Sequence, residues 1–218
     1  LAEVVAWDFG AEFDAVFLPK SSTNFIWFSE RNGFMNLFEY TTDGKLMKQL
    51  TKFNWVVTGI LGFDESGKNV FITGTGEDAR ESHTFKVNIK TGKYSKLTTQ
   101  NGTHATKLSS NGDYLIDNYS NLTTPNAIEI VDVKKAKSTS IHIAKNPLTA
   151  YNIGKTDLIT LKGANGTDLY ARVIKPANFD ETKNSYLKVA GHKASRSATF
   201  GMDTLFYWRK NLTNSKTS

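Results

Sequence analysis

Four histidines, His83, His104, His142 and His192, are the side chains of this sequence best suited to hold a metal or to transfer a proton. No two of them stand at a metal-ligand spacing such as H-x-x-x-H, and His83 and His104 fall at positions that indicate a structural role. The G-x-S-x-G pattern of a nucleophilic serine is absent, and Ser197 lacks the flanking glycines. We therefore assign no catalytic residue, no metal site and no cofactor, and the substrate-binding residues stay unknown.

The remaining chemical patterns favour turns. The segment Gly74-Thr-Gly76 lacks the Lys-Ser/Thr ending of a phosphate-binding loop, and no helical pattern follows it. Several Asn-x-Ser/Thr sequences fit the glycosylation pattern, but Asn-Gly and Asn-Thr pairs are common turn residues. The absence of cysteine excludes disulfides, a Cys nucleophile and thiolate metal sites.

The bulk composition is that of a globular protein with a packed core. The 218 residues are 39% hydrophobic and 22% charged, with a formal net charge of +6. The lysines are scattered through turns, which favours a solvated surface over a nucleic-acid partner. No apolar run reaches the roughly 20 residues needed to span a bilayer. Because the chain opens with Leu1, either a leader was removed or the start lies inside a longer product.

A repeat of short strands dominates the first two thirds of the chain. Three units follow one another, at about 13–51, 52–98 and 99–144, and the first two end in the similar triplets Gln-Leu-Thr and Lys-Leu-Thr. Each unit carries about four runs rich in β-branched and aromatic residues, bounded by Gly, Asp, Asn and Ser. Four strands per unit at a period near 45 residues are typical of β-propeller blades. We predict an all-β chain with about three four-stranded blades of a partial propeller.

Three blades cannot close a ring, since propellers typically have four to eight. An open stack would expose apolar blade faces and strand edges to solvent. We therefore expect either further blades upstream or assembly with other chains that completes the ring.

The repeat ends near Asn146-Pro147. Two β-rich runs, 156–162 and 167–174, flank a Gly/Asn turn at 163–166 and predict a hairpin. We assign 1–146 to the C-terminal blades of a propeller and 147–218 to a linker and the start of another domain. Within that second part, 202–209 is interpreted as an amphipathic helix.

Several segments, in the same order along the chain, resemble the dipeptidyl peptidase IV family of serine peptidases. The stretch 25–40 resembles the family pattern F-I-W-x-S-E-R-D-G-x-x-H-L-Y, with Asn32 in place of the Asp and Asn36 in place of the His. The other similar segments are 77–83, 102–104, 119–125 and 168–180. The resemblance covers about 13–183 and is closest to bacterial, Bacteroides-like members.

This resemblance implies late propeller blades followed by the entry strands of an incomplete α/β-hydrolase domain. The family releases N-terminal dipeptides, usually after proline or alanine, from peptides with a free N-terminus. The propeller admits only unfolded peptide ends, and a Ser-His-Asp triad lies on the hydrolase domain. We expect a periplasmic or secreted bacterial parent, and the resemblance leaves a homodimer open for it.

The family's functional residues do not carry over to this sequence. The triad is expected beyond Ser218, and the glutamates that hold the substrate amine come before residue 1, so Glu65, Glu77 and Glu81 are not given that role. No Tyr-Gly-Gly-Pro segment supplies an oxyanion Tyr, and Tyr186 lies too close to Lys183 to be its equivalent. This chain alone is therefore predicted to be inactive. The alternative is a stand-alone propeller-type module that binds a protein or peptide without catalysis.

Overall fold

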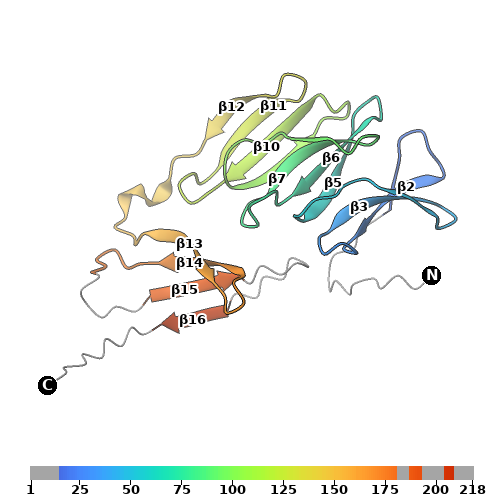
Figure 1. The fold of residues 1–218 in the computed structure, drawn as a ribbon. Coiled ribbons are helices and arrows are strands. Elements are labelled where there is room, and N and C mark those ends of the chain that lie inside the picture. Colours follow the sequence, from blue (N-terminus) through green and yellow to red (C-terminus); the bar gives the residue numbers. More distant parts are fainter. Residues whose placement is uncertain (1–14, 181–186, 193–203, 209–218) are drawn as a thin grey trace. The chain divides into compact units, whose positions relative to one another are not determined.

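The computed structural model describes residues 15–180, 187–192 and 204–208 (Figure 1). Their regular structure is β-strand throughout, apart from one short 3-10 turn, η1 (Pro147–Ala150). The chain divides into two compact units, one up to Lys145 and one from Asn146 onward.

The first unit contains three four-stranded antiparallel sheets in sequence order, coloured from blue to yellow in Figure 1. Each sheet runs from its first strand to its fourth by hairpins between neighbours, so the prediction of an all-β chain with three four-stranded blades is confirmed. The strands are β1 (Val16–Phe17), β2 (Asn24–Ser29), β3 (Asn36–Thr41) and β4 (Leu46–Gln49); β5 (Val57–Phe63), β6 (Asn69–Gly74), β7 (His83–Asn88) and β8 (Tyr94–Lys96); and β9 (Thr103–Leu108), β10 (Tyr114–Ser120), β11 (Ala127–Asp132) and β12 (Lys137–Ile143).

The turns that join the strands follow from local chemistry. In the β5–β6 turn, the Asp64 carboxylate accepts hydrogen bonds from the backbone N–H groups of Lys68 and Asn69, at 2.9 and 3.1 Å. Gly112, in the β9–β10 turn, takes a φ of 75°, and a Cβ there would lie 2.8 Å from the Cα of Asp64. A glycine is therefore needed at position 112 both for its left-handed backbone and for the close approach of the two turns.

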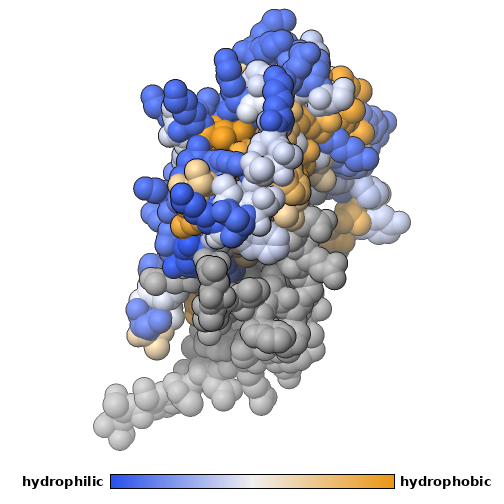
Figure 2. Space-filling view, turned by 90° about the vertical axis from the view of Figure 1, so that its right-hand side faces the viewer, coloured by the Kyte–Doolittle hydropathy of each residue, from blue (hydrophilic) through white to orange (hydrophobic). Residues whose placement is uncertain are grey.

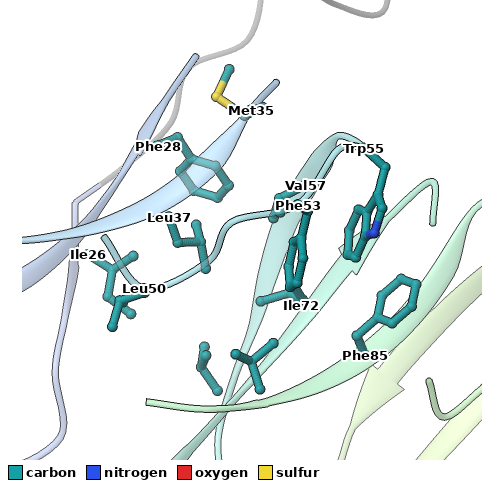
Figure 3. Close-up of a cluster of buried hydrophobic side chains, with 12 residues drawn as sticks. Ile26, Phe28, Met35, Leu37, Leu50, Phe53, Trp55, Val57, Ile72 and Phe85 are labelled. Carbon is teal, nitrogen blue, oxygen red and sulfur yellow. The ribbon is translucent and has the colours of Figure 1, made fainter. Parts of the chain in front are cut away.

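An apolar cluster fills the space between the first and second sheets (Figure 3). Trp55, in the segment that links the two sheets, stacks on Phe53 and Phe85 with ring centroids 4.0 and 4.6 Å away. The inner faces of both sheets complete the cluster with Ile26, Phe28, Met35, Leu37, Leu50, Val57, Val70, Ile72 and Val87. Each fully buried side chain of this size stabilises the fold by about 1.5–3 kcal/mol relative to its exposed state.

A second cluster joins the second sheet to the third. Phe71, which is fully buried, packs with Leu97, Leu115, Val131 and Val133. Along β10 burial alternates, so that one face of the third sheet packs inward and the other carries exposed residues. Figure 2 shows another side of the described surface, where hydrophobic side chains gather in patches among hydrophilic ones.

The second unit contains a four-stranded antiparallel sheet of β13 (Thr156–Lys162), β14 (Asp168–Ile174), β15 (Leu187–His192) and β16 (Thr204–Trp208). The predicted hairpin is confirmed by the pairing of β13 with β14 across a turn that contains Gly166 at a φ of 79°. The helix interpretation of 202–209 is wrong for its described residues. Residues 204–208 pair with β15 as a strand, which suits a run that contains three consecutive aromatic residues.

Candidate functional site

The densest group of buried polar side chains lies where the second and third sheets meet. It comprises His83 and Thr84 at the start of β7, Thr98 after β8, and His104, Thr106 and Asp117 on β9 and β10. We call these six residues the polar seam. The rings of His83 and His104 are 4.9 Å apart, and the hydroxyl oxygens of Thr84 and Thr106 are 2.6 Å apart.

Backbone hydrogen bonds reinforce the polar seam. Ser82 and Thr103 form a parallel bridge that links the strand starts of the two sheets. The Ser82 N–H donates to the Gly102 carbonyl at 3.2 Å, and the His104 N–H donates to the Ser82 carbonyl at 3.0 Å. The two sheets are therefore joined by main-chain as well as side-chain contacts.

His83 is held at both ring nitrogens. Nδ1 lies 3.0 Å from the Thr98 hydroxyl, which also accepts the Thr84 backbone N–H, and Nε2 lies 2.7 Å from a Glu81 carboxylate oxygen. Nε2 also lies 3.0 Å from Lys96 Nζ, so this nitrogen faces both a carboxylate that can only accept and an ammonium that can only donate. Burial lowers the pKa of His83 below 6.5; the Glu81 hydrogen bond opposes this effect, and the nearby charge of Lys96 adds to it.

His104 forms a closed pair with Asp117. Its Nδ1 lies 2.7 Å from Asp117 Oδ2, its Nε2 lies 2.8 Å from the Gln100 carbonyl, and its side chain has no exposed area. A carboxylate orients the imidazole of many catalytic histidines, but such a histidine needs a nitrogen that is free to take a proton. Here Asp117 and the Gln100 carbonyl place an acceptor within hydrogen-bond distance of each ring nitrogen, so neither nitrogen faces an open site.

The same hydrogen-bond arrangement occurs one repeat earlier, without histidine. Asn36 is the first residue of β3, as His83 is of β7, and its Oδ1 accepts the Thr51 hydroxyl at 2.9 Å. Thr51 in turn accepts the Leu37 backbone N–H at 2.9 Å, as Thr98 accepts that of Thr84. Sequence reasoning noted the Leu-Thr endings only as markers of the repeat. The sequence signal for this contact was a polar residue at the start of the third strand combined with a threonine just after the fourth, repeated in successive units.

A second polar feature lies on the first sheet, in the segment that resembles the family pattern. The Arg31 guanidinium lies over the ring of Phe38, 4.5 Å from its centroid, and its Nε donates to the Ser29 hydroxyl at 3.1 Å. Arg31 also donates to the Tyr40 hydroxyl. This arginine therefore turns back onto its own sheet and stabilises the β2–β3 hairpin.

The other residues weighed from the sequence lie apart from one another. Glu65 and Glu77 are in turns, Gly74 is the last residue of β6, and His142 is in β12. These four residues therefore do not form one site. The structure describes His192 only as backbone, at the end of β15, while Tyr186 and Ser197 lie outside the described residues. In the part of the chain that the structure describes, no three His, Asp or Glu residues are grouped to hold a metal.

The fold and site therefore define a β-sheet repeat protein whose buried polar residues join its sheets. Residues 7–126 match the family model of the dipeptidyl peptidase IV (DPP IV) N-terminal region, which is more than half of the chain. The chain belongs to the dipeptidyl peptidase IV family. Among the described residues, no helix is long and apolar enough to cross a membrane.

Curated relatives and solved structures agree with this family. The chain is 27% identical over 162 residues to dipeptidyl peptidase 4 of Arthroderma otae. This match covers 71% of this chain and 21% of that protein. A structure described as a dipeptidyl aminopeptidase IV from Bacteroides ovatus has a TM-score of 0.69 and 36% identity, covering 78% of this chain and 27% of that one. Porphyromonas gingivalis dipeptidyl peptidase 4 has a TM-score of 0.65 and 25% identity, covering 78% and 24%. The chain thus spans about a fifth to a quarter of the length of these relatives.

Proposed function

We propose that this chain is part of a serine exopeptidase that releases N-terminal dipeptides, usually after proline or alanine. Its three sheets limit access to the catalytic centre to unfolded peptide ends. The observation that carries the proposal is the match of residues 7–126 to the dipeptidyl peptidase IV N-terminal region. The relatives named dipeptidyl peptidase 4 support it.

The sheets suit a role in access because they are held rigidly to each other. The aromatic stack around Trp55 joins the first sheet to the second, and the polar seam joins the second to the third. Sheets joined in this way select substrates by shape and need no reactive group of their own. The occupied nitrogens of His83 and His104 fit this passive role.

The chain by itself is expected to have no peptidase activity, because its 218 residues contain no G-x-S-x-G motif. The test is hydrolysis of a Gly-Pro chromogenic substrate by the purified chain, with a serine-reactive phosphonate as a probe for a nucleophile. We expect neither turnover nor labelling. Turnover that is lost on replacing a serine of this chain would contradict the assignment of the triad to another part of the protein.

The gene region around this sequence provides the positive test. We expect a pair of adjacent glutamates upstream and a Gly-x-Ser-x-Gly motif downstream. The longer product should cleave the Gly-Pro substrate and lose that activity when the motif serine becomes alanine. A longer product that carries the motif but shows no dipeptide release from any N-terminal Xaa-Pro or Xaa-Ala peptide would refute the proposal.

The access role has a separate readout in the longer product. Loosening the polar seam with Thr106→Val, which removes the hydroxyl that contacts Thr84 across the two sheets, should leave cleavage of the short chromogenic substrate unchanged and raise cleavage of long or folded peptides relative to it. An unchanged ratio would refute the access role while leaving the peptidase assignment intact. We place the protein in the periplasm or outside the cell, and fractionation of the producing cells tests this location.

One observation favours the alternative, a stand-alone binding module. Tyr114, Ile116 and Ile130 are exposed on the outward face of the third sheet, with Ile116 and Ile130 directly opposite each other. Exposed apolar residues on a sheet face often mark an interaction surface. A stable, monodisperse oligomer of this chain in light scattering would favour the module. Aggregation would favour a part of a larger enzyme.

A further inference from the structure

Four Asn-Gly pairs occur in the sequence, and all four lie in turns of the described chain: 32–33, 101–102, 111–112 and 165–166. Asparagine is a thermolabile residue. When glycine follows it, the glycine backbone nitrogen can attack the asparagine Cγ with little steric hindrance. The attack requires that nitrogen to be free of a hydrogen bond and the amide side chain to be free to rotate.

Three of the pairs are held in unreactive arrangements. The glycine N–H groups of Gly33, Gly112 and Gly166 donate to backbone carbonyls at 2.7, 3.0 and 2.9 Å. Their asparagine side chains are bonded as well: Asn32 donates to Gln49, Asn111 accepts from Ser109 and Asp113, and Asn165 accepts from Thr167. Reaction at these sites requires at least two hydrogen bonds to break first.

The pair Asn101-Gly102 differs in both respects. The side chain of Asn101 is exposed and makes no hydrogen bond to any described residue, and no described acceptor takes the Gly102 N–H. At this site neither the attacking nitrogen nor the amide side chain has to be released from a hydrogen bond with a described residue.

We propose that Asn101 is a site of spontaneous deamidation that converts it to isoaspartate. The Gly102 nitrogen forms a bond to Asn101 Cγ, the bond from Cγ to the amide nitrogen breaks, and ammonia leaves with the proton lost by Gly102. Water then opens the cyclic imide. Cleavage at the former main-chain carbonyl gives isoaspartate, and cleavage at Cγ gives aspartate.

The modification would fall next to the polar seam. The Asn101 carbonyl accepts the Asn121 side-chain amide at 3.0 Å, and the Gly102 carbonyl accepts the Ser82 N–H. Gly102 also lies tightly against the Ser120 carbonyl, since a Cβ on it would be 2.3 Å from that oxygen. Isoaspartate inserts one extra carbon into the main chain at this point. The hydrogen bonds to Ser82 and Asn121 are therefore strained, and the junction of the second and third sheets weakens with age.

The experiment is a time course of the purified chain in mildly alkaline buffer, with peptide mapping by mass spectrometry at all four pairs. The probe is the mass difference between the amide and the carboxylic acid, with isoaspartate and aspartate peptides separated by chromatography. Because two hydrogen bonds protect each of the other sites, Asn101 should react about tenfold faster than they do. Equal or slower reaction at Asn101 would overturn the proposal.

Two controls make the result specific. In the urea-unfolded chain all four pairs should react at similar rates, because the protection comes from the fold. Asn101→Gln should abolish the fast reaction without a change in the unfolding midpoint. The isolated isoaspartate form should melt about 2–4 °C lower for each hydrogen bond lost, and an unchanged midpoint would refute its effect on the polar seam.

Discussion

Thr98 follows β8, the fourth strand of the second sheet. Its buried hydroxyl binds two groups of β7, the third strand of the same sheet. The hydroxyl accepts the Thr84 N–H at 3.2 Å and lies 3.0 Å from Nδ1 of His83. Thr98→Val keeps the shape of the side chain and leaves both groups without this partner. Because each buried polar group left unsatisfied costs about 1–3 kcal/mol, we expect the free energy of unfolding to fall by about 2–5 kcal/mol.

The first sheet offers a matched substitution with a smaller expected loss. Thr51→Val removes the acceptor of the Leu37 N–H and the donor to Asn36 Oδ1. Asn36 Oδ1 still accepts the Phe53 N–H at 2.9 Å, so only one group is left fully unsatisfied. The expected loss is about 1–3 kcal/mol, below that of Thr98→Val. Thr139→Val, at an exposed position of β12, serves as the control and should change the free energy by no more than about 0.5 kcal/mol.

Urea unfolding followed by tryptophan fluorescence measures these losses, since Trp55 lies in the stack between the first two sheets. The transition midpoint should move while its slope stays constant, so that the change reports stability alone. If Thr98→Val unfolds at the same urea concentration as Thr139→Val, the hydrogen bonds of the polar seam do not stabilise the fold, and the reasoning is refuted. Equal losses for Thr98→Val and Thr51→Val would refute the compensating role of the Phe53 N–H.

Two further predictions concern His83 and Gly74. Because burial lowers the pKa of His83 below 6.5, the folded state disfavours its protonated form, and stability should decrease as the pH falls below 6.5. The titratable groups around His83 are Glu81, Lys96 and His104. His83→Asn should reduce the pH dependence of stability in urea titrations. An unchanged pH dependence would assign it to groups other than His83. A Cβ on Gly74 would lie 2.5 Å from Cζ3 of Trp55, so Gly74→Ala should lower stability by about 1–3 kcal/mol through steric overlap. A Cβ on Gly44 would have no atom within 4 Å, but Gly44→Ala places alanine at a φ of 84°. Thermal melting should therefore show a stability loss of about 1 kcal/mol for Gly44→Ala. A smaller loss for Gly74→Ala would contradict the steric overlap.

The repeat could be predicted from the sequence because strands and turns depend on local preferences. The β-branched and aromatic runs, together with turns such as 64–67 and 109–112, specify hairpins without reference to distant residues. The interpretation of 202–209 as a helix failed for its described residues because the apolar spacing of a short segment does not distinguish a helix from a strand. Pairing with β15, a long-range contact, decided that case.

The contacts of the residues at the sheet junction could be found only from the tertiary structure. The sequence by itself determined that His83 and His104 stand near strand starts in successive units and that no serine motif accompanies them. Only the fold decided that their rings lie 4.9 Å apart and that acceptors or donors occupy all four ring nitrogens. The physical reason is that a strand's sequence specifies which residues share its face, whereas the chemistry of a buried histidine depends on partners that other strands supply.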